Sequence, residues 1–75
     1  MIKTVHQLII DIPVEVSERF YHTDEFHCMF HTAAANAVSS SIDYHQIIIS
    51  YDSITDAIQW DKFLNEKINE YKEQL

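Results

Sequence analysis

Residues 42–51 read IDYHQIIISY and include a run of three isoleucines at positions 47–49. A short, continuous apolar run of this kind is typical of a strand that is buried on both faces, and such a strand lies inside a sheet rather than at its edge. The pattern therefore predicts a strand near residues 43–51 in the more central position of a sheet, against which the other elements pack.

A helix is expected directly after this strand. Ser53 is a suitable N-cap, and apolar residues then recur at three- and four-residue steps, as on one face of a helix. These positions predict a helix near residues 54–73, with an apolar stripe made of Ala57, Trp60, Leu64, Ile68, Tyr71 and Leu75.

A second helix is expected before the strand, near residues 24–38. Thr23 is a candidate N-cap, and Asp24 and Glu25 follow at positions where carboxylates interact favourably with the helix dipole. The apolar face of this helix would consist of Phe26, Met29, Phe30, Ala33 and Ala37, and the three serines at positions 39–41 are expected to end it.

The N-terminal segment predicts a further strand, near residues 4–12, because apolar residues occupy the even positions from Leu8 to Val16. Pro13 has no amide hydrogen to donate to a neighbouring strand. We therefore expect an edge strand that bends at Pro13. Residues 17–22 suit a strand, a turn or the start of a short helix equally well.

Taken together, the elements predict an α/β fold, or α+β as the alternative, in the order strand, helix, strand, helix. A small sheet of two or three strands would be covered by two helices in a single domain spanning residues 1–75. If the strands are parallel neighbours, the connection between them is right-handed. The expected core contains Leu8, Ile10, Phe26, Phe30, Ile47, Ile49, Trp60, Leu64 and Ile68.

Composition excludes several classes of function. The net charge of -7 disfavours direct binding to nucleic acid or to an anionic membrane, and the absence of glycine excludes glycine-rich phosphate loops. A single cysteine, Cys28, cannot form an internal disulfide, so we expect a cytoplasmic protein. We find no signal peptide and no apolar run of the roughly 20 residues that cross a bilayer.

A cluster of histidines offers the only pattern related to metal chemistry. On the expected helix near residues 24–38, Asp24, His27 and His31 project in similar directions and could supply three ligands. The spacing lacks the His-Glu-x-x-His motif, and a structural zinc site normally needs four ligands. We therefore expect no metal, no cofactor and no enzymatic activity, and keep these three residues as a weaker alternative.

The last helix carries the candidate binding site. Viewed along its axis, Glu66, Glu70 and Glu73 cluster with Asp56 nearby, and Phe63 projects among them, away from the apolar stripe. An aromatic side chain among carboxylates is typical of an interface anchor. The alternative is an ordinary solvated acidic face, with Phe63 packed under the N-terminal segment.

These features favour a non-enzymatic, acidic module that binds a protein with a basic surface. One form would be a phosphate-mimicking inhibitor of a nucleic-acid-binding protein, which has the gross composition of phage or mobile-element anti-restriction and anti-CRISPR proteins. The alternative is a homo-oligomeric structural or regulatory subunit, such as a homodimer, that pairs through the apolar stripe of the last helix. A metal-binding domain is the third hypothesis.

Overall fold

The structure is a computed structural model that describes residues 4–75. Its elements follow in the order β1 (His6–Asp11), α1 (Val14–Phe20), α2 (Asp24–Ala34), β2 (Ser39–Ile42), β3 (Gln46–Tyr51) and α3 (Ile54–Glu73). The strands form an antiparallel sheet in the order β1-β3-β2. The fold is therefore α+β, and the antiparallel pairing excludes the right-handed crossover that parallel strands would have required.

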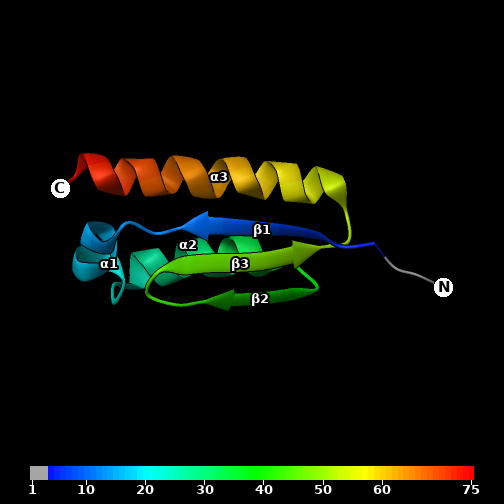
Figure 1. Cartoon of the computed structure of the whole chain (residues 1–75), viewed down its shortest axis with the longest axis horizontal. Helices are drawn as coiled ribbons and strands as arrows, with labels where there is room; N and C mark the ends of the chain where they lie inside the picture. The colour runs from blue at the N-terminus through cyan, green and yellow to red at the C-terminus, as the bar shows by residue number, and fades with distance from the viewer. Residues whose placement is uncertain (1–3) are drawn as a thin grey trace.

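The central position of β3 is confirmed, but its burial on both faces is not. Ile47, Ile49 and Tyr51 are fully buried, whereas Ile48, which points to the opposite face, is only half-buried. Figure 1 shows the reason: the helices lie on one side of the sheet or along its β1 edge, and no helix within residues 4–75 covers the other face. In β1, likewise, Ile10 is buried and Ile9 is 58% exposed.

A tight turn occupies the first residues of the segment that was expected to form one strand near residues 43–51. The Asp43 carboxylate accepts hydrogen bonds from the backbone N–H groups of His45 and Gln46, at 2.7 and 2.8 Å. These hydrogen bonds hold the pKa of Asp43 below its ordinary value. The chain reverses here, so β3 begins only at Gln46, and residues 39–42 pair with it as β2. The three serines thus form a strand and do not merely end a helix.

Pro13 starts a helix, which corrects the expectation of a bent strand. Strand β1 ends at Asp11, and Pro13, with φ of -57°, is the N-cap of the short helix α1. A proline is tolerated at a helix start because the amide it lacks would have no partner within the helix. The Ser17 hydroxyl in α1 donates a 2.5 Å hydrogen bond to the backbone carbonyl of Tyr44. This contact joins α1 to the β2–β3 turn.

The two longer helices begin where their caps predict. The Thr23 hydroxyl accepts the Phe26 N–H at 3.2 Å, and the Ser53 hydroxyl accepts the Asp56 N–H at 3.4 Å. Helix α3 has the expected bounds, whereas α2 ends at Ala34, earlier than the expected residue 38. The residues after α2 are needed to reach the edge of the sheet and start β2.

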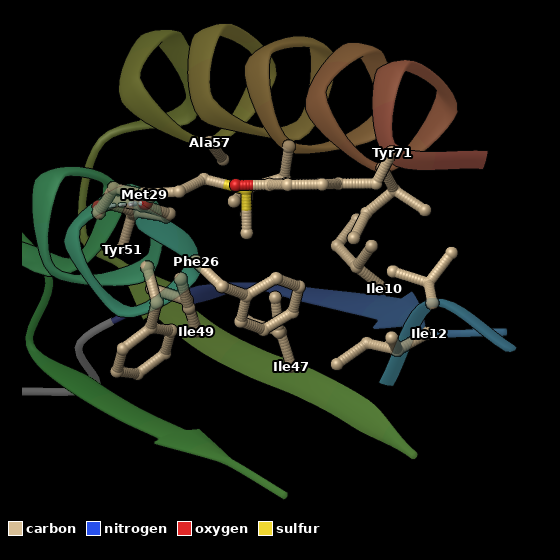
Figure 2. Close-up of a cluster of buried hydrophobic side chains, with 14 residues drawn as sticks. Ile10, Ile12, Phe26, Met29, Ile47, Ile49, Tyr51, Ala57 and Tyr71 are labelled. Carbon is tan, nitrogen blue, oxygen red and sulfur yellow. Dashed lines mark hydrogen bonds between the residues drawn. The ribbon is translucent and has the colours of Figure 1, made fainter. Parts of the chain in front are cut away.

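The core fills the space between α3, α2 and the inner face of the sheet, as Figure 2 shows for Phe26 and Met29 of α2 and Ala57 and Tyr71 of α3. Seven of the nine expected core residues are buried, and Leu8 and Trp60 are half-buried at its margin. The Tyr71 ring packs 4.7 Å from that of Phe20 and 5.6 Å from that of Phe26, so it joins all three helices.

Candidate functional site: the acidic face of the last helix

Three exposed carboxylates lie on successive turns of α3. They belong to Glu66, Glu70 and Glu73, which we call the acidic face. At a rise of about 1.5 Å per residue, they extend over about 10 Å of a helix that is about 30 Å long. Glu70 also forms an ion pair with Lys67 at 3.4 Å, but both side chains remain substantially exposed. Both groups are therefore accessible to a partner. An exposed pair of this kind contributes little to stability, so exchanging it for contacts with a partner costs little.

Asp56 lies apart from the acidic face. It is half-buried in the first turn of α3, about 15 Å along the helix axis from Glu66. Burial chiefly, and then the charge of Asp56, raises the pKa of Tyr51 to about 12. Asp56 is thus close to the end of β3, and the structure does not bring it together with the three glutamates.

Phe63 is not an isolated aromatic on the polar side of α3. It is half-buried and packs against the core, and its ring meets that of Trp60 edge-on at 5.2 Å. The Lys67 ammonium lies 5.8 Å from the centre of the Phe63 ring. The expectation that Phe63 projects away from the apolar stripe is therefore wrong: it lies on the flank between that stripe and the acidic face.

Trp60 belongs to the same surface, which the sequence pattern did not indicate. Its position in the apolar stripe predicted a core residue, but it is half-buried beside Phe63. Aromatic residues are enriched in the centres of protein interfaces. Trp60 and Phe63 form what we call the aromatic pair. The one signal in the sequence is their spacing, because residues three apart on a helix are neighbours.

The end of α3 also connects to the first turn of α2. Burial raises the pKa of the Tyr71 hydroxyl, and the charge of Glu25, its hydrogen bond with Tyr71 and the charge of Glu70 act in the same direction. A further carboxylate, that of Glu25 in α2, therefore lies near the same tyrosine as Glu70 of the acidic face.

The histidine cluster does not assemble as a set of ligands. His27 is half-buried, with its ring 5.4 Å from that of Tyr21, whereas Asp24 and His31 are exposed. Over residues 4–75, His, Cys, Asp and Glu side chains form no group of three that could hold a metal ion. Cys28 is exposed and free.

A second aromatic group lies at the end of the sheet next to α1 and the β2–β3 turn (Figure 1). The Tyr21 ring contacts His22, His27 and Tyr44, with centroids 5.3 to 5.4 Å apart. These residues come from the α1–α2 connection, α2 and the β2–β3 turn. The sequence could not indicate this group, because the turn at Asp43 that brings Tyr44 to Tyr21 was not predicted.

The part of the chain that the structure describes has no pocket, and none of its helices is long and apolar enough to cross a membrane. No protein-family model, curated protein or solved structure matches the chain.

Proposed function

We propose that the protein is a non-enzymatic binding module whose acidic face contacts a partner protein with a basic surface. One observation carries this proposal: three exposed carboxylates occupy successive turns of one helix, in a chain of net charge -7. Charges arranged in this way attract a cationic surface over several ångströms and orient it during encounter. The reducing cytoplasm is the proposed compartment, since the single cysteine is free.

The chemistry of the acidic face favours a partner that normally binds nucleic acid. Successive carboxylates are separated by about 6 Å and about 4.5 Å along the helix axis. A nucleic acid backbone likewise presents a row of regularly spaced negative charges, and its protein partners bind that row with lysines and arginines. A basic groove of this kind would accept the acidic face and be blocked by it. We therefore propose inhibition by competition with nucleic acid.

The aromatic pair adds an apolar contact beside these charges. Trp60 and Phe63 are both half-buried, so part of each ring remains available to a partner. Charges mainly speed association, whereas aromatic contacts that become fully buried slow dissociation. The proposed binding surface thus consists of the acidic face with the aromatic pair along its flank, without Asp56, which lies apart from it.

The proposal is tested by capture from an extract of the host cell with three tagged baits, followed by mass spectrometry. The baits are the wild type, Glu66→Lys/Glu70→Lys and the control Asp11→Lys/Glu18→Lys, whose four side chains are all exposed. Both variants change the net charge by the same amount. We expect a partner that the wild type and the control capture and that the acidic-face variant loses.

The captured partner is then tested for nucleic acid binding by fluorescence anisotropy. We expect the wild type to displace the nucleic acid and the acidic-face variant to fail at the same concentration. Equal capture by both charge variants would reject the acidic face as the binding surface. Capture without displacement would reject competition and leave a binding module of a different role.

A further inference from the structure

Strand β2 leaves one edge of the sheet open. The sheet order is β1-β3-β2, so β1 and β2 are the two edge strands. Figure 1 shows α3 running alongside β1, whereas no helix or strand within residues 4–75 lies beyond β2. Serines 39–41 are exposed, and Ile42 is half-buried.

The register identifies the backbone groups on this open edge. Asp43 donates its N–H to the Gln46 carbonyl, so these two residues form a hydrogen-bonded pair of the antiparallel ladder. Bonded and non-bonded pairs alternate along such a ladder. The pairs Ser41–Ile48 and Ser39–Ser50 are therefore the bonded ones. It follows that Ser40 and Ile42 direct their N–H and C=O groups away from β3.

Natural proteins protect open edges with charged residues, with proline or by keeping the edge strand very short. Strand β2 is short, with the four residues Ser-Ser-Ser-Ile, but it carries neither a charge nor a proline. The chain as a whole has a net charge of -7, so an uncharged edge is the place where two copies can approach with the least repulsion. A foreign peptide that adds to a sheet edge is selected by pockets for its side chains. Three small serines offer such a peptide little to bind, so a second copy of this chain is the favoured occupant.

We propose that two copies of this chain pair through their β2 strands, antiparallel, about a two-fold axis at Ser41. Ser40 of each copy lies opposite Ile42 of the other, and each such pair exchanges two N–H···O=C hydrogen bonds. The dimer has a continuous six-stranded sheet whose two halves present their helix-covered face on the same side, with one α3 along each outer edge. Asp43, the nearest charged residue, lies opposite Ser39 of the second copy and does not face another carboxylate.

This dimer is independent of the proposed contact with a basic partner. Helix α3 and β2 lie at opposite sides of the sheet in Figure 1, so pairing leaves both acidic faces exposed. The interface is small, and interfaces below about 1,200 Å² are usually weak and transient. We expect a Kd in the range of about 10 µM to 1 mM, and a dimer that binds a partner with two sites more tightly than the monomer.

Disulfide trapping tests the proposed register. In the non-bonded pair at the two-fold axis, the two Ser41 Cα atoms would lie about 4.5 Å apart, which a disulfide can span. We expect Cys28→Ser/Ser41→Cys to form a cross-linked dimer in oxidised glutathione. The control Cys28→Ser/Ser39→Cys should stay monomeric, because its two thiols would be about 14 Å apart along the strands. Equal cross-linking of the two proteins, or of neither, would overturn the register.

Sedimentation equilibrium tests the association itself. Ser40→Pro removes an outward N–H and keeps every bond between β2 and β3. We expect wild-type mass to rise towards twice the chain mass of 8.8 kDa with concentration, and Ser40→Pro to dimerise at least about tenfold more weakly. Ser41→Lys, which opposes two ammonium groups, should weaken the dimer similarly, whereas Ser41→Thr should not. A wild type that stays monomeric up to about 1 mM, or folded variants that associate equally well, would refute the proposal.

Discussion

Individual buried side chains determine how the helices attach to the sheet. Leu64 is fully buried on the inner side of α3, and Tyr51 is fully buried on the inner face of β3. The Tyr51 hydroxyl donates a hydrogen bond to the backbone carbonyl of Ala33 in α2. A polar group is therefore accommodated in the core because its partner is a carbonyl near the end of a helix.

Leu64→Ala should lower the free energy of unfolding by about 2 to 5 kcal/mol, because it removes apolar contacts and leaves a cavity. Urea unfolding followed by circular dichroism measures this loss. Leu75→Ala is the control, since Leu75 is 51% exposed, and it should unfold like the wild type. An unchanged midpoint for Leu64→Ala would contradict the assignment of this side chain to the core.

Tyr51 should make stability decrease at high pH. Burial, with a contribution from the charge of Asp56, raises its pKa from 10.0 to about 12. The folded state therefore favours the protonated form of Tyr51. This stabilisation, of about 3 kcal/mol, is complete below pH 10 and is lost as the pH rises through 12.

Urea unfolding of the wild type and Tyr51→Phe between pH 8 and about pH 12 measures this loss. The variant should be less stable at pH 8, since it leaves the Ala33 carbonyl without its bond, and its stability should fall less steeply above pH 10. Parallel curves for the two proteins would exclude Tyr51 as the titrating group.

At the scale of elements, the helices are specified locally and the sheet is not. Helix α3 has the predicted bounds because its cap and its apolar spacing lie within the same segment. Strand β2 could not be predicted, because three serines have little strand preference of their own and pair only after the turn at Asp43 has placed them beside β3.

In the candidate site, too, the features that depend on one helix were predictable and those that depend on tertiary contacts were not. Glu66, Glu70 and Glu73 were expected to share an exposed face, and their spacing within one helix is enough to place them there. The surroundings of Phe63 were misjudged, because its burial depends on contact with the core and with Trp60. Tertiary contacts of this kind leave no periodic signal in the sequence.

Thr23→Ala should destabilise the protein by about 1 to 2 kcal/mol. The Thr23 hydroxyl accepts the Phe26 N–H at the start of α2 and donates to the Phe20 carbonyl at the end of α1, at 2.7 Å. Thr23→Ser keeps both bonds and should be nearly neutral. Ser53→Ala should cost less than Thr23→Ala, because the Ser53 cap bond is longer, at 3.4 Å. Thermal melts of the three variants decide the order, and the reverse order would contradict these roles.

Phe63→Ala should weaken binding to the captured partner by about 2 kcal/mol, or roughly thirtyfold, if its exposed portion enters a partner pocket. Ile58→Ala is the matched control: Ile58 is 65% exposed on another side of α3, and its loss should leave the affinity unchanged. Isothermal titration calorimetry measures both, and circular dichroism verifies folding. Equal affinities for the two folded variants would remove the aromatic pair from the binding surface.

The whole molecule is elongated, with extents of 46 × 18 × 17 Å. Its radius of gyration is 12.5 Å, against about 11 Å expected for a compact domain of this length. The long helix α3 forms one side and the open edge of β2 the other (Figure 1). The shape therefore separates the surface proposed to bind a basic partner from the edge proposed to bind a second copy.

The central claim is that the acidic face of α3 binds a basic partner. Its most direct test is the association rate constant of the captured partner with the wild type, Glu66→Lys/Glu70→Lys and Asp11→Lys/Glu18→Lys, measured at about 0.01 and 0.15 M salt. Salt should slow the wild type and the control strongly, because attraction between charges steers the encounter. The acidic-face variant should associate more slowly at low salt and respond less to added salt. If this variant folds and matches the control at both salt concentrations, the acidic face is not the binding surface.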